Sequence, residues 1–247
     1  MPISPQFTSV YSQDWEINFL QCTPNGLLRY TELCNLMQLT AGSHAELGGM
    51  SFTDMQEHNQ AWVLSRMRVE IDELPKWRDV VTVKTWILDL QGSRSIRALE
   101  MYIGDKKVAG ALTYWAVFNT KLRKSEALAQ PHEHFEKYPD RMPTEESFKK
   151  VEITREAETT GERTVMLSDL DIDFHANNVK YLEWCLDAID FKPLLKQQLQ
   201  SFDMNYLREL KLGDKVQLKK GIQENQTYFT IVKGETPIFS LELNWKP

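Results

Sequence analysis

A short run in the second half of the chain gathers side chains that can move protons. Residues 168–178 read SDLDIDFHANN, so three aspartates alternate with other residues before a histidine and two asparagines. Carboxylates and imidazoles are the side chains that most often act as general acids and bases. Asp171, Asp173 and His175 are therefore candidates for a catalytic site.

Alternating aspartates also suggest a calcium loop of the EF-hand type. Counted from Asp169, position 6 is Phe174, where the sharp turn needs glycine, and position 12 is Lys180, where a bidentate glutamate is needed. The calcium loop is excluded on both counts. Asn177 or Asn178 is expected to cap the helix that follows, with the aspartates favoured by its dipole, but capping does not account for the histidine.

The elements that hold this run belong to a repeated unit. Three segments of the first half recur in the same order in the second half, which indicates two copies of one domain. The matched pairs are RYTELC (29–34) with KYLEWC (180–185), DVVTVK (79–84) with DKVQLK (214–219), and GDKKV (104–108) with GETPI (234–238).

Each copy is expected to combine one helix with several strands. Residues 27–45 are apolar nearly all round a helix, which predicts that this helix is buried. A period of two predicts a strand with one wet face, in which Val63, Met67, Val69 and Ile71 alternate with Arg66, Arg68, Glu70 and Asp72. Residues 111–118 are apolar on both faces and suit a central strand. The Gly104-Asp105 pair predicts a hairpin turn, and the fold class is α+β.

Three prolines among charged residues mark the connection between the copies. Residues 130–150 show neither the helical nor the strand periodicity of apolar residues, as is typical of a linker. The predicted organisation is an N-terminal domain at 1–130, a linker at 131–150 and a C-terminal domain at 151–247.

Composition excludes several classes of protein. The 247 residues carry a formal net charge of −6, which argues against general affinity for nucleic acid. There is no apolar run long enough to span a membrane, and the first residues lack the features of a signal peptide, so we expect a cytoplasmic protein. Cys22, Cys34 and Cys185 are widely spaced and are expected to be reduced core residues.

Residues 168–181 resemble the signature of the acyl-acyl carrier protein (acyl-ACP) thioesterases of plants and bacteria, a D-x-D-x-N-x-H-x-N-N segment that leads into a helix. The first half resembles the same family in WVLSRM (62–67) and in PKWRD (75–79) running to Trp86. The resemblance implies a tandem (double) hotdog fold, in which an antiparallel sheet wraps a long central helix twice. It also implies an enzyme of fatty acid biosynthesis and lipid metabolism.

The resemblance implies a catalytic set of Asp171, Asp173, His175 and Glu209. Two positions depart from the family: Asp173 stands where the family has asparagine, and Leu210 stands where plant members have a cysteine once suspected as the nucleophile. We therefore expect no cysteine chemistry. Asp173 either replaces the asparagine or shares the work of the base.

The implied reaction is the hydrolysis of a fatty acyl-ACP thioester to free fatty acid and holo-ACP. Glu209 and His175 are expected to activate a water, Asp171 to orient the site, and backbone N–H groups of residues 176–178 to stabilise the oxyanion. No cofactor is expected. Carboxylates with one histidine can hold Mn, Fe or Mg, but no second histidine lies nearby in sequence, so a metal-free site is preferred.

The first copy lacks these acids and the histidine, having Leu20, Cys22 and Pro24 at the corresponding places. It is expected to bind the acyl chain. The expected substrate-binding residues of the two copies are Leu33, Met37, Trp62, Met67, Asn177 and Asn178.

The expected partner is ACP, an acidic protein. Lysines could form its landing site, although solvated strand faces are the preferred interpretation of them; they are Lys149, Lys150, Lys211, Lys215, Lys219 and Lys220. Two other functions stay open, namely an acyl-CoA thioesterase of the same fold and a non-catalytic module that binds acyl chains or ACP. The sequence also leaves open whether the chain is a monomer or a homodimer.

Overall fold

The computed structural model describes residues 3–196 and 198–246. The first half contains β1 (Val10–Glu16), η1 (Phe19–Gln21), α1 (Tyr30–Leu47), α2 (Phe52–Glu57), β2 (Gln60–Ile71), β3 (Val80–Gln91), β4 (Arg94–Ile103), β5 (Lys106–Asn119) and β6 (Lys124–Ser125). The second half contains β7 (Glu158–Thr164), η2 (Leu167–Asp169), α3 (Asn178–Asp187), α4 (Phe191–Leu195), β8 (Leu199–Tyr206), β9 (Lys215–Gln223), β10 (Gln226–Lys233) and β11 (Thr236–Trp245). Apart from β6, the halves repeat one order of elements.

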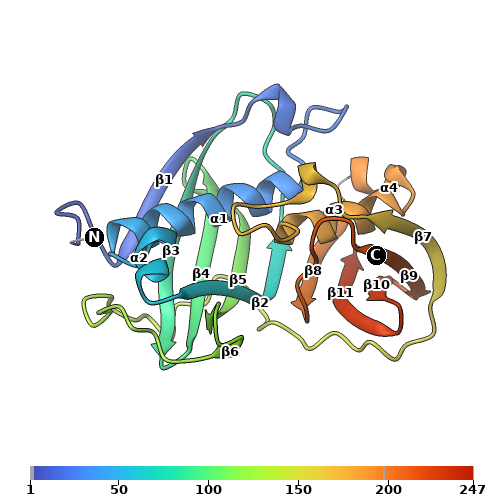
Figure 1. Ribbon diagram of the computed structural model, residues 1–247. Coiled ribbons are helices and arrows are strands. Elements are labelled where there is room, and N and C mark those ends of the chain that lie inside the picture. Colours follow the sequence, from blue (N-terminus) through green and yellow to red (C-terminus); the bar gives the residue numbers. More distant parts are fainter. Residues whose placement is uncertain (1–2, 197, 247) are drawn as a thin grey trace.

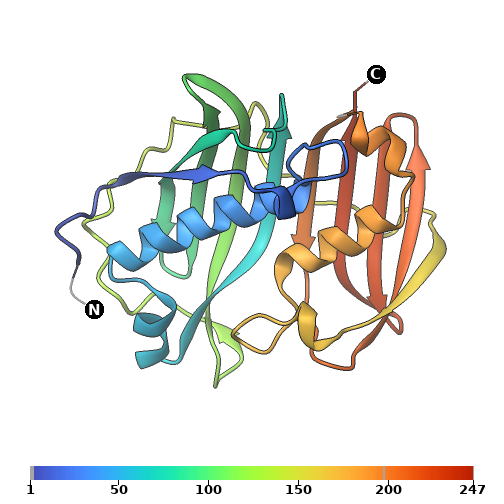
Figure 2. The same cartoon turned by 90° about the horizontal axis from the view of Figure 1, so that it is seen from above.

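Within the described residues, eleven strands form a single antiparallel sheet. Its order is β1-β3-β4-β5-β2-β8-β11-β10-β9-β7, with β6 paired to β5. Strands β2 and β8 join the two halves, from Arg66 opposite Asn205 to Glu70 opposite Ser201. Helices α1 and α3 lie side by side on the same face of this sheet (Figures 1 and 2).

The predicted helix and strands are present, with one correction to the helix. It begins at Tyr30 rather than at residue 27, because Leu27 forms a bridge with Lys76 instead of helical hydrogen bonds. The prediction that it is buried nearly all round is wrong: the side chain of Leu39 is 55% exposed. The sheet covers only one face of α1, and the other face is left to line a cavity.

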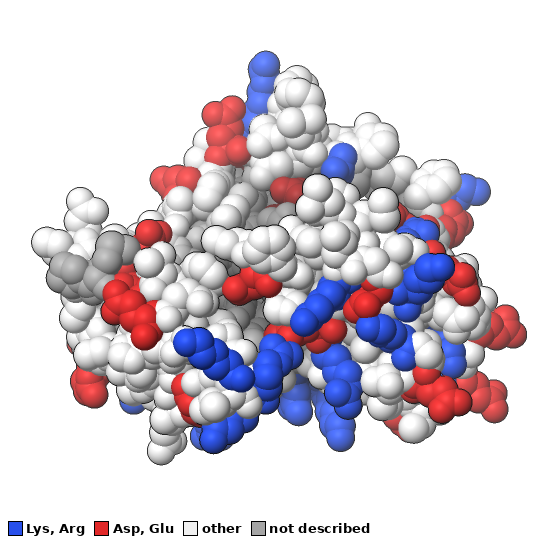
Figure 3. All heavy atoms as spheres, in the orientation of Figure 1, with Lys and Arg blue, Asp and Glu red and all other residues white. Residues whose placement is uncertain are grey.

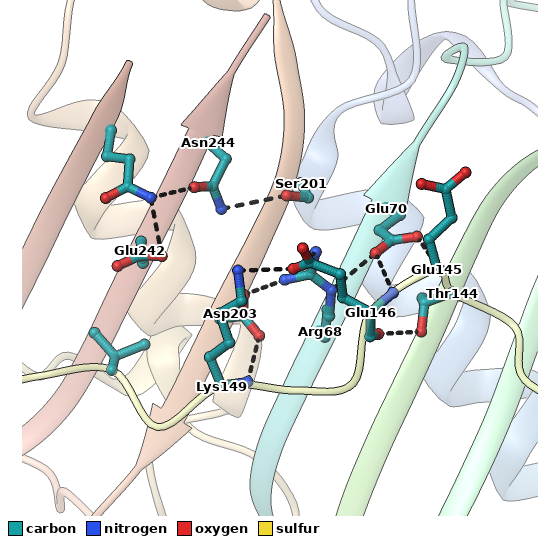
Figure 4. A network of polar contacts seen from close by, with 12 residues as sticks. Arg68, Glu70, Thr144, Glu145, Glu146, Lys149, Ser201, Asp203, Glu242 and Asn244 are labelled. Atoms are coloured by element: carbon teal, nitrogen blue, oxygen red, sulfur yellow. Dashed lines mark hydrogen bonds and ion pairs between the residues drawn. The ribbon is translucent and has the colours of Figure 1, made fainter. Parts of the chain in front are cut away.

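The predicted wet face of β2 is also corrected. Arg68 is only 4% exposed, because the segment between the halves crosses the sheet there and brings Glu146 within 3.0 Å of its guanidinium (Figure 4). The backbone N–H of Glu145 donates to Glu70 at 2.6 Å, and that of Lys149 donates to Asp203 at 2.9 Å. The predicted linker is therefore packed against both halves.

A large apolar core runs through both halves. Its buried side chains include Leu33 of α1 and Trp184 of α3. Cys22, Cys34 and Cys185 are free and buried, as predicted. No helix among the described residues is long and apolar enough to cross a membrane.

Candidate active site

The loop between η2 and α3 is folded around the carboxylate of Asp171. Its Oδ1 accepts hydrogen bonds from the backbone N–H of Asp173 at 2.9 Å and of His175 at 3.3 Å. The backbone N–H of Asp171 donates to the His175 carbonyl at 2.9 Å, and Phe174 takes a left-handed φ of 60°. Asp171 thus fixes the loop that presents Asp173 and His175.

Backbone pairing brings Glu209 beside this loop. The residue lies in the connection between β8 and β9, where the Leu210 carbonyl accepts from the N–H of Ala176 at 2.8 Å. As a result, Oε2 of Glu209 lies 3.4 Å from Nε2 of His175. The same Oε2 lies 2.8 Å from an Nη atom of Arg123, which comes from the first half.

Asp173 carries a carboxylate in a crowded, partly desolvated place. Burial raises its pKa above the ordinary value, and the negative charges of Asp171 and Glu209 raise it further, while His175 opposes them. The environment therefore favours the neutral acid at position 173 more than water would. A neutral carboxyl can donate a hydrogen bond, as the amide of an asparagine does.

Asn177 and Asn178, which follow the loop, form different hydrogen bonds. Asn177 is the N-cap of α3, with Oδ1 accepting from the N–H of Val179 at 2.9 Å. Asn178 reaches across to α1, where its Nδ2 donates to Oε1 of Gln38 at 2.6 Å. Its own Oδ1 is buried and has no partner among the residues that the structure describes.

Only one of the three proposed oxyanion donors remains free. The N–H of Ala176 donates to Leu210 and that of Asn177 donates to Asp169, both at 2.8 Å. The N–H of Asn178, at the first position of α3, has no acceptor in the described part of the chain. Of the three backbone groups, we therefore expect the N–H of Asn178, at the positive end of the α3 dipole, to stabilise the oxyanion.

Two neighbouring cavities meet at this site. One of about 1100 Å³ is lined by Asp171, Asp173, His175 and Glu209. The other, of about 760 Å³, lies beside the outward face of α1 and is bordered by the α2 segment. They share the lining residues Gln38, Ala61, Trp62, Trp115, Asp173 and Asn177.

The smaller cavity has a buried cation in its wall. Arg97 is 6% exposed, and an Nη atom lies 2.7 Å from Nδ1 of His44, whose Nε2 is 2.9 Å from the Thr8 carbonyl. Burial lowers the pKa of Arg97 to about 10, and burial together with Arg97 lowers that of His44 to about 3. At neutral pH a neutral imidazole thus accepts from the guanidinium and donates to the carbonyl.

The structure separates the residues predicted to bind substrate. Trp62 and Asn177 line both cavities, and Asn178 lines the larger one. Leu33, Met37 and Met67 are fully buried in the core and are not among the lining residues of either cavity. The sequence analysis did not find Gln38 and Arg123, which also line the larger cavity. Gln38 could have been noticed as a polar residue within the apolar pattern of the helix. No feature of the sequence around Arg123 points to the site.

The described residues bring no further metal-ligating side chains to Asp171, Asp173, His175 and Glu209. Among residues 3–196 and 198–246, no group of three or more His, Cys, Asp or Glu side chains is arranged to hold a metal ion. Within the set, Asp171 accepts from the backbone N–H of Asp173 and His175, and Glu209 contacts the His175 ring.

Comparison with known proteins places the chain in a family. Models of the acyl-ACP thioesterase N-terminal and C-terminal domains match residues 8–136 and 152–246. The palmitoyl-acyl carrier protein thioesterase of Gossypium hirsutum is 27% identical over 245 residues, covering 92% of this chain and 58% of that protein. That of Arabidopsis thaliana is 29% identical over 217 residues, covering 81% and 52%. The chain therefore spans a little over half the length of these curated relatives.

Solved structures show the same fold over nearly the whole chain. The acyl-ACP thioesterase of Bacteroides thetaiotaomicron superimposes with a TM-score of 0.88 at 24% identity, over 96% of this chain and 98% of that one. The 12:0-ACP thioesterase of Umbellularia californica gives 0.81 at 18% identity, over 97% and 98%. The predicted tandem hotdog is confirmed, and with both domain models matched, the chain belongs to the acyl-ACP thioesterase family.

Proposed function

We propose that this chain hydrolyses fatty acyl-ACP thioesters to a free fatty acid and holo-ACP. The observation that carries the proposal is the convergence of Asp171, Asp173, His175 and Glu209 on one cavity, with Glu209 and His175 3.4 Å apart. Membership in the family, whose relatives are named for this activity, supports the choice of substrate.

In the proposed reaction, Glu209 uses its other carboxylate oxygen, Oε1, to remove a proton from a water that it positions together with His175. The resulting hydroxide attacks the thioester carbonyl carbon, and the N–H of Asn178 stabilises the oxyanion. The carbon–sulfur bond then breaks, and the proton passes to the leaving pantetheine thiolate. Asp171 holds the loop in place, and Asp173, with its raised pKa, donates a hydrogen bond or shares the base.

The two cavities suit the two ends of such a substrate. The larger cavity would hold the thioester and the pantetheine arm, and the smaller would hold the acyl chain, which passes Trp62 and Trp115 at the shared wall. Both tryptophans belong to the first half, which agrees with the expectation that the first half binds the acyl chain and the second half carries the catalytic residues. The division itself stays a prediction.

The basic groups at the larger cavity favour an acidic carrier. Arg208 and Lys211 are exposed, line this cavity, and form no ion pair within the described residues. On the face of the molecule that Figure 3 presents, Lys and Arg side chains gather in the lower middle. Of the six lysines considered as a possible landing site, only Lys211 lines the cavity. We propose that ACP docks at Arg208 and Lys211. A cytoplasmic location stays a prediction, and whether two copies pair stays open.

Thiol release from acyl-ACP and acyl-CoA of matched chain length tests the proposal. We expect faster turnover of acyl-ACP, with Glu209→Ala and His175→Ala each lowering kcat by about 10² to 10⁴-fold while the circular dichroism spectrum is unchanged. Preference for acyl-CoA would favour the related CoA enzyme. Tight binding of acyl-ACP without thiol release would indicate the binding module, and full activity of Glu209→Ala would refute the assigned base.

A further inference from the structure

The catalytic centre receives one charged side chain from the first half. Arg123 lies in the turn between β5 and β6, and one of its Nη atoms is 2.8 Å from Oε2 of Glu209, 86 residues along the chain. The contact joins the two halves at the proposed base.

The turn that carries Arg123 is held by several contacts. Oδ1 of Asn119 accepts from the backbone N–H of Lys121 and Leu122, and the Asn119 carbonyl accepts from the N–H of Arg123. Arg123 itself takes a φ of 54°, a left-handed conformation that non-glycine residues seldom adopt. Its guanidinium lies 5.1 Å from the centre of the Phe118 ring. The cation is thus directed toward Glu209 by the turn and by an aromatic face.

The contact restricts the Glu209 carboxylate. Oε2 faces both Arg123 at 2.8 Å and Nε2 of His175 at 3.4 Å, whereas Oε1 has no donor among the residues described. A carboxylate held by one oxygen keeps the other in a fixed direction, ready to accept a proton.

We propose that Arg123 is a positioning residue, which orients Glu209 for proton transfer and makes the first half a part of the catalytic centre. The inference rests on the proposed function. As a stabilising ion pair the contact counts for little, because the two side chains are 56% and 28% exposed and such pairs contribute about 0 to 1 kcal/mol. A large loss of activity on removing Arg123 would therefore not come from unfolding.

The same turn provides a matched control. Lys124 is exposed and, within the described chain, forms no ion pair, so Lys124→Gln removes one positive charge from the same hairpin without touching Glu209. The set to compare is Arg123→Gln, Arg123→Lys, Lys124→Gln, Glu209→Gln and the double variant Arg123→Gln/Glu209→Gln. Each is assayed on acyl-ACP and on acyl-pantetheine, which has no carrier.

We expect Arg123→Gln to lower kcat about 10-fold or more on both substrates with little change in KM, since small misplacements of a reacting group are costly. Arg123→Lys should recover part of the loss, and Lys124→Gln should keep the wild-type kcat. The double variant should be no slower than Glu209→Gln alone, because Arg123 acts through Glu209.

Two results would overturn the inference while leaving the proposed function intact. One is an Arg123→Gln enzyme that only raises KM for acyl-ACP and hydrolyses acyl-pantetheine normally, which would make Arg123 a docking charge. The other is additive losses in the double variant. A wild-type protein that releases no thiol from either substrate would refute the proposed function, and this inference with it.

Discussion

At the scale of single residues, position 173 decides how closely this site follows its family. Asp173 stands where the family signature has asparagine, and its raised pKa arises first from burial and then from Asp171 and Glu209. We expect Asp173→Asn to keep substantial thioesterase activity, because asparagine has the same shape and can donate the hydrogen bond of a neutral acid. Activity that falls to the level of Asp173→Ala would show that the carboxylate is the working base.

The same substitution should stabilise the fold in a pH-dependent manner. A carboxyl whose folded pKa lies above its ordinary value of 3.8 favours the protonated native state, so its contribution to stability is full below that value and is lost as pH rises through the folded pKa. Asp173→Asn should therefore melt at a higher temperature than wild type at pH 7, and the difference should shrink at pH 4. The exposed linker change Asp140→Asn is the control, and an equal difference at both pH values would contradict the expectation.

At the scale of elements, the sequence predicted where a helix and strands lie but not which helix faces line cavities. The helix pattern of residues 27–45 located α1, and the DxDxDxH segment located the loop before α3. Leu33 and Met37 look like good pocket residues in sequence, yet both are fully buried against the sheet. Cavity walls depend on how elements pack in three dimensions, and the repeat reports only their order. The contact of Arg123 with Glu209 lay beyond prediction for the same reason.

We expect the start of β2 to set chain-length preference, because Ala61 there is 7% exposed and lines both cavities. Ala61→Leu should narrow the passage and shift hydrolysis toward shorter chains. Each methylene that no longer fits should cost about 0.8 kcal/mol of burial, or roughly fourfold in kcat/KM.

Met37→Leu is the control for Ala61→Leu, because it conserves volume in the core and lies outside both cavities. Competition assays with acyl-ACPs of graded length measure both variants. A profile altered by Met37→Leu and untouched by Ala61→Leu would place the chain elsewhere.

At the scale of the whole molecule, the halves are joined by strand pairing as well as by apolar packing. Arg68 on β2 lies opposite Asp203 on β8, and the two side chains form an ion pair that is 4% and 0% exposed. Arg68 also contacts Glu70 at 2.9 Å and Glu146 of the connecting segment at 3.0 Å (Figure 4). One guanidinium thus links both halves and the segment between them, which the repeat in the sequence could not reveal.

Removing that guanidinium should destabilise the protein as a unit. Arg68→Leu leaves the Asp203 carboxylate buried without its cation, and breaking a buried pair in this way costs about 3 to 5 kcal/mol. For a chain of this size the melting temperature should fall by roughly 6 to 20 °C. Arg66→Leu, on the same strand and without an ion pair in the described residues, should change stability by about 0.5 kcal/mol or less.

The double variant Arg68→Leu/Asp203→Leu separates the cost of a stranded charge from the loss of the link between the halves. Burial raises the pKa of Asp203 even with Arg68 beside it, so an apolar pair should recover much of the loss, as replacement of buried ion pairs often does. Calorimetry should then show one transition near the wild-type temperature. If the double variant melts in two steps, or no higher than Arg68→Leu, the ion pair itself holds the halves together, and strand pairing with the shared core is not enough.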